Sequence, residues 1–318
     1  MKIAVVIPCY KVVDHIEKVL TEIGSEVKWI ICVDDGCPEG SGDYINSKKN
    51  DSRIIVLFHE NNKGVGGATL TGFNYSIKLG ADVIIKIDGD GQMDPSLIPV
   101  MVLPIKNNEA DYTKGNRFYY VEDISDMPFI RVLGNLILSF MSKVSSGYWD
   151  LFDPTNGFLA IDAKVFSKLP ISKISNDYFF ESDMLFRLNI LKAVVVEVPM
   201  RASYKDEQSN LKISKNIPIF FLGHLRNSVK RIFYNYYLRD FSIGSIALPF
   251  SILLTFFSLW FGIDQWLNSI QTGIPATTGT VFLSALPFIV SVQLFILFLS
   301  EDIARIPKYP IHKMLQKE

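Results

Sequence analysis

The 318-residue sequence predicts an α/β fold with a mostly parallel sheet, followed by a membrane anchor, and three observations support this prediction. Short apolar runs rich in β-branched residues alternate with segments of helical periodicity over the first two thirds of the chain. Acidic or glycine-rich segments follow several of these runs directly. Two long stretches without charge lie in the last third of the chain. Strands that alternate with helices favour a parallel sheet covered on both faces, because the crossover helices lie on those faces.

Four predicted strands account for much of the first hundred residues. They are the apolar runs at residues 3–7, 29–33, 54–58 and 83–87. The spacing of Asp14 and Glu17 is that of a capping box and predicts a helix that ends near Gly24. A second helix is predicted from about Ala68 to Leu79. Residues 1–215 are therefore expected to form one domain.

Overall charge and cysteine content exclude several classes of protein. Lysine and arginine number 32 and aspartate and glutamate 33, so the net charge of −1 argues against a nucleic-acid-binding protein. The three cysteines, Cys9, Cys32 and Cys37, have no CxxC spacing and no nearby histidine pair. Neither a disulfide framework nor a zinc site is expected.

The segment KIDGDGQMDP at residues 86–95 directly follows the fourth predicted strand. In open α/β sheets, ligands bind beyond the carboxyl ends of the strands. Alternate residues of an extended segment point the same way, so Asp88, Asp90 and Gln92 are expected to face one site. Their oxygen atoms suit Mg²⁺ or Mn²⁺ bound to phosphate. A solvated acidic turn is the alternative, and for an isolated Asp-x-Asp it is the commoner one.

Three familiar ligand-binding motifs do not fit the acidic segment or the glycine-rich segment that precedes it in the sequence. An EF-hand that started at Asp88 would need Gly and Glu where Met93 and Pro99 stand. The segment NKGVGGAT at residues 62–69 ends in Thr69 where a Rossmann fingerprint needs Gly or Ala, and it lacks the Gly-Lys-Ser/Thr of a Walker A loop. It is expected to be a flexible loop that leads into a helix N-terminus, suited to phosphate or ribose.

Two uncharged segments near the C-terminus predict a membrane hairpin. Residues 241–263 and 277–300 are each long enough to cross a hydrocarbon core of about 30 Å. A buried helical hairpin of a soluble domain is the alternative. The connection 264–276 has no Lys or Arg, whereas basic residues precede the first segment and lie in the tail 301–318. The positive-inside rule then places both ends, and the N-terminal domain, in the cytoplasm.

The segment 216–240 predicts an amphipathic helix next to the membrane. Its expected apolar face consists of Phe221, Leu225, Val229, Ile232 and Tyr236, and its expected polar residues are Arg226, Lys230 and Arg231, with His224 as a candidate contact for lipid phosphate. A simple anchor with basic flanking residues explains the pattern almost equally well.

Several motifs, in this order, carry a resemblance to a known family. They are VVIPCYK at 5–11, VDDGCPEGSG at 33–42, NNKGVGGA at 61–68, IDGDGQMDP at 87–95, KGNR at 114–117, DPTNGF at 153–158 and YFFESDML at 178–185. Together they resemble the family 2 glycosyltransferases. With the C-terminal hairpin, the whole chain looks like the polyprenyl-phosphate branch, similar to dolichol-phosphate mannose synthases and the bacterial enzymes that load undecaprenyl phosphate.

The resemblance implies a GT-A fold and a set of donor-site residues. Pro8 and Tyr10 resemble part of the nucleotide site, and Asp35 matches the acidic residue that meets the base. The metal-binding DxDxQ motif of the family is matched by Asp88, Asp90 and Gln92. Asp88 is also expected to contact the nucleotide-sugar. Gly89 and Gly91 replace the usual Ala and Leu, which is expected to loosen the loop. The remaining implied donor-site residues are Lys63, Arg201 and Lys212.

The same resemblance implies acceptor and catalytic residues. Arg117 and Arg131 match arginines that receive phosphate, although Arg131 fits an ordinary helix-surface residue equally well. The family places catalytic carboxylates at the positions of Asp90, Asp153, Glu181 and Asp183. The alternative interpretation of such a residue is a solvated or helix-capping acid.

The expected function is therefore inverting, metal-dependent transfer of a sugar from a nucleotide-sugar to polyprenyl phosphate at the cytoplasmic face of the plasma membrane. UDP-glucose or UDP-N-acetylglucosamine is the expected donor, and the product would supply cell-surface glycan assembly or modification. Direct transfer to a lipid-linked glycan and a non-catalytic, membrane-tethered sugar-nucleotide-binding protein are the alternatives. A homo-oligomer is compatible with the sequence.

Overall fold

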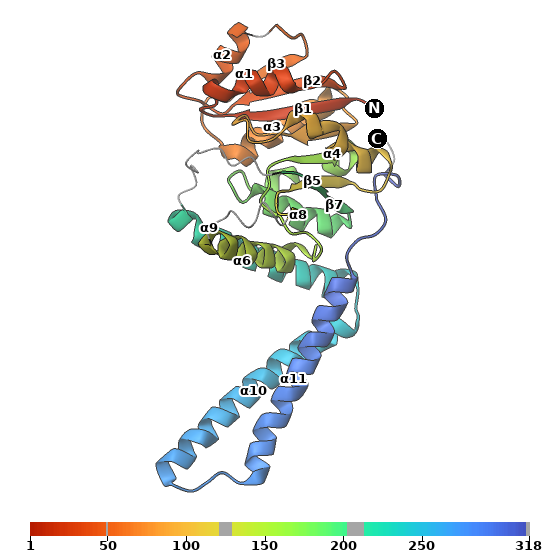
Figure 1. Ribbon diagram of the computed structural model, residues 1–318. Coiled ribbons are helices and arrows are strands. Elements are labelled where there is room, and N and C mark those ends of the chain that lie inside the picture. The colour runs from red at the N-terminus through yellow and green to blue at the C-terminus, as the bar shows by residue number, and fades with distance from the viewer. Residues whose placement is uncertain (49, 121–128, 202–212, 316–318) are drawn as a thin grey trace. The chain divides into compact units, whose positions relative to one another are not determined.

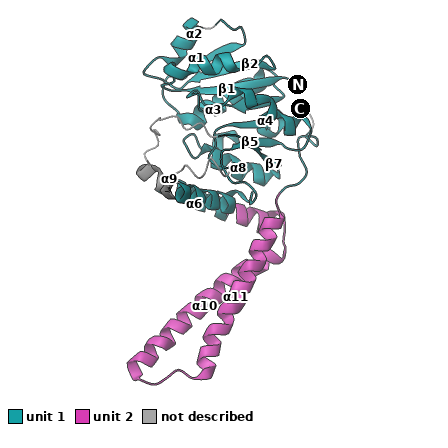
Figure 2. Cartoon of the chain, in the orientation of Figure 1, with its two compact units in different colours: residues 1–229, 307–318 teal, residues 230–306 magenta. Residues whose placement is uncertain are grey.

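The computed structural model describes residues 1–48, 50–120, 129–201 and 213–315, with the backbone path alone at 129–131 and 213–217 (Figure 1). The chain forms two compact units. Unit 1 consists of Met1–Val229 together with Pro307–Glu318, and unit 2 consists of Lys230–Ile306 (Figure 2).

Unit 1 is an α/β domain with seven strands in its described part. Its elements are β1 (Ile3–Cys9), α1 (Val13–Glu22), β2 (Val27–Asp34), α2 (Ser41–Lys48), β3 (Ile54–Phe58), α3 (Gly64–Lys78), β4 (Val83–Lys86), η1 (Pro95–Leu97), α4 (Ile98–Lys106), β5 (Tyr112–Asn116), α6 (Phe129–Ser146), β6 (Leu159–Asp162), α7 (Ala163–Ser167), η2 (Ile171–Lys173), α8 (Phe180–Leu191), β7 (Val195–Pro199) and most of α9 (Ile213–Phe233). The four strands predicted from the apolar runs are confirmed, with bounds that differ by at most two residues.

The strands form one sheet in the order β3-β2-β1-β4-β6-β5-β7. All strands run parallel except β6, which pairs antiparallel with both β4 and β5. The carboxyl ends of the six parallel strands therefore meet at one edge of the sheet, and β6 begins at that edge. The predicted, mostly parallel sheet is confirmed.

Helices cover both faces of the sheet (Figure 1). On one face, Ile16 of α1 and Met101 of α4 join Val5 and Ile7 of β1 in the main apolar core. On the other face, α3 packs so closely that a Cβ at Gly72 would lie 2.3 Å from a methyl carbon of Val6. The sheet is thus buried on both sides, which explains why its central strands are continuous apolar runs.

Two expected helix starts are wrong. The capping box at Asp14 is not formed, because α1 begins at Val13 and its N-cap residue, Val12, makes no side-chain capping bond. Helix α3 begins at Gly64, so the glycine-rich segment is its first turn and not a loop. The glycines serve packing there, since a Cβ at Gly66 would lie 2.6 Å from the carbonyl oxygen of Ser175.

Unit 2 contains the two long apolar helices. It begins within α9, continues through the π-helical segment η3 (Tyr234–Arg239) and contains α10 (Ile243–Thr272) and α11 (Thr278–Ala304). Both helices are long and apolar enough to cross a membrane, with mean hydropathies of 2.0 and 2.4 over their most apolar windows. Helix α10 extends nine residues beyond the predicted span that ends at residue 263. The two helices lie side by side, and Ser251 Oγ of α10 donates to the carbonyl of Ser291 at 2.9 Å.

The end of this hairpin holds a buried ion pair. Arg231 donates through Nη1 and Nη2 to the two carboxylate oxygens of Asp302, at 2.7 and 2.9 Å. The hydroxyl of Tyr236 donates to Asp302 at 3.0 Å, and its ring packs on Phe298. Tyr236 and Arg231 are thus buried, in contrast to the exposed apolar and polar positions expected for them on the amphipathic segment.

The tail after α11 returns to unit 1. The backbone N–H groups of Ile311 and His312 donate to the carboxylate of Asp111, both at 2.9 Å, and His312 Nδ1 donates to it at 2.7 Å. Asp111 is fully buried and also accepts from the backbone of Val194 at the start of β7. This carboxylate therefore joins the tail to the beginning of two neighbouring strands.

Candidate active site

The sheet edge where the parallel strands end collects most of the predicted site residues. Tyr10 follows β1 and is exposed, and Pro8 is the penultimate residue of that strand. Asp35 follows β2, the acidic segment follows β4, Arg117 follows β5, and Arg201 lies just after β7. Residues 153–158 lead into β6 from the same edge. Topology thus brings together segments that lie up to 190 residues apart.

The acidic segment forms a tight turn. Asp88 and Asp90 are half-buried and Gln92 is exposed, with the backbone N–H of Gln92 donating to Asp90 Oδ1 at 3.0 Å. Gly91 has a φ of +73°, a conformation that favours glycine. Gly89 is buried, and a Cβ there would lie 3.2 Å from Val12. The glycines therefore fit a packed turn, in contrast to the loosening expected from them.

The donor set of this turn fits a hard divalent cation. Asp88 and Asp90 offer carboxylate oxygens, and Gln92 offers an amide oxygen. Within the part of the chain that the structure describes, no group of three or more His, Cys, Asp or Glu residues is gathered for a metal ion. Two carboxylates on one turn suit Mg²⁺ or Mn²⁺, which commonly take further oxygen ligands from substrate phosphates.

Asp35 is the centre of a hydrogen-bond network at the start of α3. It is 3% exposed. His59 Nδ1 donates to its Oδ1 at 2.6 Å, and the backbone N–H groups of Lys63 and Gly64 donate to Oδ1 and Oδ2 at 2.9 and 2.8 Å. The second ring nitrogen of His59 bonds Thr71 Oγ1. Asp35 therefore fixes the start of α3, and its contact with a base stays a prediction. The side chain of Lys63 is exposed.

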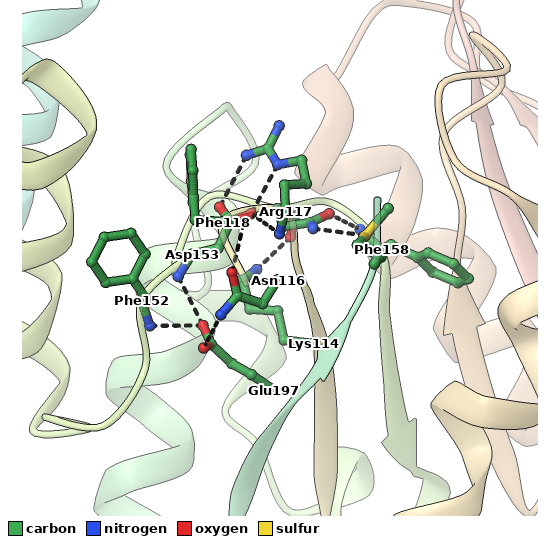
Figure 3. Close-up of polar contacts among 10 residues, drawn as sticks. Lys114, Asn116, Arg117, Phe118, Phe152, Asp153, Phe158 and Glu197 are labelled. Carbon is green, nitrogen blue, oxygen red and sulfur yellow. Dashed lines mark hydrogen bonds and ion pairs between the residues drawn. The ribbon is translucent and has the colours of Figure 1, made fainter. Parts of the chain in front are cut away.

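Arg117 and Asp153 form a bidentate ion pair (Figure 3). Arg117 Nε and Nη2 donate to the two oxygens of Asp153 at 2.8 and 2.9 Å, and the backbone N–H of Arg117 donates at 3.1 Å. Asp153 is fully buried, whereas 30% of the Arg117 side chain is exposed. The carboxylate thus holds a guanidinium group at the open edge of the sheet.

The carboxylate of Glu197 accepts hydrogen bonds from the two segments that carry this pair. Its Oε1 accepts from the backbone N–H groups of Phe152 and Asp153, at 2.7 and 2.8 Å, and its Oε2 accepts from Asn116 Nδ2 at 2.7 Å (Figure 3). Burial raises the pKa of Glu197, and the backbone hydrogen bonds oppose that rise. The carboxylate ties β7 to β5 and to the segment that carries Asp153.

Two buried lysines lie beneath the turn and the ion pair. Lys86 Nζ donates to Asp88 Oδ1 at 2.6 Å, to the carbonyl of Gly157 at 3.3 Å and to Glu181 Oε1 at 3.4 Å. Lys114 Nζ donates to the carbonyl of Asn156. Burial lowers the pKa of Lys114 to about 8, although nearby carboxylates oppose this shift. Glu181 is thus held by a buried cation, and its predicted catalytic role stays a prediction.

Asp183 is fully enclosed by contacts within unit 1. It accepts from Arg187 Nε and Nη2 at 3.1 and 3.0 Å, from the backbone of Ser175 at 3.0 Å and from Asn227 Nδ2 at 3.0 Å. These bonds attach α9 to α8, so the contacts of Asp183 are accounted for without a ligand. Its catalytic role also stays a prediction.

Three predicted residues have few or no described contacts. Lys212 lies outside the described residues, and Arg131 is described only by its backbone position in α6. Arg201 is exposed, and its guanidinium carbon lies 5.7 Å from the ring centre of Tyr120.

Comparison with known proteins decides the family. The family model described as "Glycosyl transferase family 2" matches residues 4–169, which is more than half of the chain. This chain belongs to glycosyl transferase family 2. The matched region contains β1 to β6 and all the loops that carry the acidic turn and the Arg117–Asp153 pair.

Two curated family members illustrate the similarity. A UDP-N-acetylglucosamine–dolichyl-phosphate N-acetylglucosaminyltransferase of Methanococcus voltae is 33% identical over 154 residues, which are 48% of this chain and 61% of that protein. An undecaprenyl-phosphate mannosyltransferase of Micrococcus luteus is 28% identical over 204 residues, which are 63% of this chain and 83% of that protein. The chain thus spans less than two thirds of the first relative's length.

Solved structures support the fold of this glycosyltransferase. Glucosyl-3-phosphoglycerate synthase from Mycobacterium tuberculosis, in a complex with Mn²⁺ and UDP, superposes with a TM-score of 0.54 at 17% identity and covers 72% of this chain and 79% of its own. Mannosyl-3-phosphoglycerate synthase from Rubrobacter xylanophilus gives a TM-score of 0.56 at 15% identity, with 76% and 77% covered. The expected GT-A fold is confirmed.

Sequence reasoning about this family 2 chain missed three residues that make hydrogen bonds near the sheet edge. They are Lys86, His59 and Glu197. Lys86 and Glu197 are charged residues inside otherwise apolar strands, where Lys86 is buried and Glu197 is half-buried. That mismatch is a usable signal, because charged side chains are rarely buried without a partner. The partner of each was not predictable, since it lies far away in sequence.

Proposed function

We propose that this protein transfers a sugar from a nucleotide-sugar to polyprenyl phosphate at the membrane surface. One observation carries the proposal: a turn with two carboxylates and a guanidinium held by a buried carboxylate lie at the same sheet edge. Residues 153–157 connect them, since Asp153 binds Arg117 while Gly157 contacts Lys86 below Asp88. The first group suits a metal-bound diphosphate, and the second suits a phosphate acceptor.

On the donor side, Asp88, Asp90 and Gln92 would hold the divalent cation. The cation would neutralise the negative charge that accumulates on the departing diphosphate. The Mn²⁺ and UDP named for the Mycobacterium tuberculosis structure support this arrangement by fold analogy. We favour UDP-glucose or UDP-N-acetylglucosamine as donor, and GDP-mannose is the competing donor, since the two curated relatives are named for different sugars.

On the acceptor side, Arg117 presents planar donors that suit phosphate oxygens. The bond from the sugar's anomeric carbon to the donor phosphate breaks, and a new bond forms to an oxygen of the polyprenyl phosphate, with inversion at that carbon. The nucleoside diphosphate leaves with the bonding electrons. Because the acceptor oxygen is already anionic near neutral pH, a carboxylate such as Asp153 serves orientation more than deprotonation.

Apolar surfaces on unit 1 support a membrane location. Helix α6 exposes Leu133, Leu136, Ile137 and Phe140, and helix α9 exposes Phe221, Leu222, Leu225 and Val229. A hydrogen bond between Ser145 of α6 and His224 of α9 joins the two helices, which lie side by side in Figure 1. His224 is buried, so it does not offer the lipid-phosphate contact expected from the sequence. Exposed apolar patches of this kind mark membrane or protein contacts. With α10 and α11 as anchors, we place the catalytic unit on the cytoplasmic face.

The test is sugar transfer by the detergent-solubilised full chain. Radiolabelled UDP-glucose, UDP-N-acetylglucosamine and GDP-mannose are each offered with undecaprenyl phosphate and Mg²⁺ or Mn²⁺. We expect a chloroform-extractable product from one donor, its loss on removal of the metal with EDTA, and a loss of at least a hundredfold in Asp90→Asn. Asp94→Asn is the matched control, because Asp94 is an exposed acid in the same segment whose side chain accepts from Ser96 N.

Failure takes two informative forms. Nucleotide binding with no transfer to bare undecaprenyl phosphate, but with transfer to a lipid-linked glycan, would replace the acceptor. Nucleotide binding with no transfer to either acceptor would favour a non-catalytic tether.

A further inference from the structure

We propose that Lys86 is a positioning residue that holds Asp88 in the orientation needed to bind the donor's divalent cation, an inference that rests on the proposed function. Lys86 is the last residue of β4, at the centre of the sheet, and 1% of its side chain is exposed. Strand alternation directs Lys86 and Asp88 to the same face, away from Ile85 and Ile87. The ammonium group therefore lies directly below the acidic turn.

The ammonium group is fully matched by acceptors from three segments. Asp88 Oδ1, the carbonyl of Gly157 and Glu181 Oε1 lie 2.6, 3.3 and 3.4 Å from Nζ. They belong to the acidic turn, to the segment that precedes β6, and to α8. An ammonium group has three hydrogens, so this arrangement satisfies all of them. Asp88 Oδ1 forms the shortest of these contacts and is thereby fixed on the inner side of the turn.

Gly157 provides an independent sign that the pair is built into the site. A Cβ at this glycine would lie 2.5 Å from both Asp88 Oδ2 and Lys86 Nζ. No other residue fits beside the pair without moving it. The backbone approaches closely enough to accept from Lys86 while it limits the positions open to the second oxygen of Asp88.

The stability of the fold does not by itself explain a buried, charged lysine. Replacing a buried ion pair by apolar residues of similar size is often neutral or stabilising, so the charge needs another reason. Lys114 shows the difference, because it is equally buried at the same sheet edge but donates to the carbonyl of Asn156. Of the two lysines, Lys86 is the one that contacts the acidic turn.

The test measures Mn²⁺ binding directly, by the electron paramagnetic resonance signal of free Mn²⁺. The full chain in detergent is titrated with Mn²⁺ in the presence of UDP, and separately of GDP, without any acceptor. The key variant is Lys86→Met/Glu181→Gln, which removes the lysine together with the buried carboxylate of Glu181, so that this carboxylate is not left without its cation. Glu181→Gln alone is the reference for the double variant, and Lys114→Met is the matched control.

We expect the double variant to bind Mn²⁺ at least tenfold more weakly than Glu181→Gln, and Lys114→Met to stay within twofold of wild type. Adding Asp88→Asn to the double variant should weaken binding no further, although it weakens binding in wild type, because both changes act through one carboxylate. A purely structural lysine would not produce this non-additivity.

Three results would overturn the inference: equal Mn²⁺ affinity in the double variant and Glu181→Gln, an additive effect of Asp88→Asn, or a wild type that binds no Mn²⁺ with either nucleotide. Because no acceptor is present, the outcome is separate from the acceptor assignment. A protein that binds Mn²⁺ as expected yet fails to glycosylate undecaprenyl phosphate would contradict the proposed function alone.

Discussion

Two bidentate arginine–aspartate pairs, one in each unit, have nearly the same geometry but opposite surroundings. In unit 1, Arg117 binds Asp153 at 2.8 and 2.9 Å with 30% of its side chain exposed. In unit 2, Arg231 binds Asp302 at 2.7 and 2.9 Å, with the two side chains 3% and 2% exposed. The bond lengths of the two pairs are alike, so the exposure of the arginine is what distinguishes them.

The difference follows from where each arginine lies. Arg117 follows a strand at the open edge of the sheet, so a phosphate can approach its guanidinium while Asp153 holds it. Arg231 is buried and donates to Asp302, which also accepts from the hydroxyl of Tyr236. The donors of Arg231 are therefore used within the hairpin unit itself. Removing either arginine should therefore affect different properties: stability in unit 2 and ligand affinity in unit 1.

The largest effect is expected from Arg231→Met, which leaves Asp302 buried without its cation. We expect a loss of about 3–5 kcal/mol in the free energy of unfolding, measured by titrating the detergent-solubilised protein with SDS. Arg231→Met/Asp302→Asn should recover most of it, since the amide still accepts from Tyr236. A single variant that loses less than about 1 kcal/mol would show that this pair behaves like a surface pair.

Acid should weaken unit 1 through His224, a buried group whose ring is hydrogen-bonded to the hydroxyl of Ser145. Burial lowers the pKa of His224 to about 4, against an ordinary value of 6.5. The folded protein then binds fewer protons than the unfolded chain between these values, so stability is complete above pH 6.5 and falls as the pH drops towards 4. The shift corresponds to about 3 kcal/mol. His224→Asn should show a flatter stability profile over this range, and an unchanged slope would contradict the assignment.

A smaller effect on stability, but a clear one on substrate affinity, is expected from Arg117→Gln. Loss of the guanidinium should raise the KM for undecaprenyl phosphate about tenfold to a hundredfold, or about 1.4–2.7 kcal/mol, with less change in kcat. Arg53→Gln is the matched control, because Arg53 also forms a half-buried bidentate pair, with Asp51, but just before β3, at the opposite end of a parallel strand. Equal effects of the two variants on KM would show that Arg117 does not meet the acceptor.

The smallest effect is expected from Lys18→Ala. Lys18 and Glu22 lie 3.6 Å apart on α1 with 62% and 44% of their side chains exposed. Solvent screens such a pair, so the free energy of unfolding should change by less than about 0.5 kcal/mol. A larger loss in the same SDS titration would mean that exposure does not rank these ion pairs.

The fold was largely predictable because its strands are short, apolar and rich in β-branched residues, and such runs carry their own signal. The end of the fourth predicted strand also located the acidic turn, whereas Arg117 was identified only through the family resemblance. The partners of the site carboxylates were less predictable. Asp183 binds Asn227 from 44 positions away, and Lys86 contacts Glu181 from 95 positions away. No local pattern encodes such pairings, since they depend on how helices dock on the sheet. The start of α3 was missed for a related reason, because its glycines pack closely against the backbone of residues 175 and 176, which is distant in sequence.

The bond between the C-terminal tail and Asp111 has a consequence for how the protein is made. Translation proceeds from the N-terminus, so Asp111 leaves the ribosome about 200 residues before His312 does. During that interval both apolar helices are synthesised. Asp111, beside the starts of β5 and β7, lacks its hydrogen bonds to the tail until residues 311 and 312 have been added. Unit 1 can therefore complete its own structure only after both apolar helices have been synthesised, which couples the final folding step of the α/β domain to the synthesis of the helical hairpin.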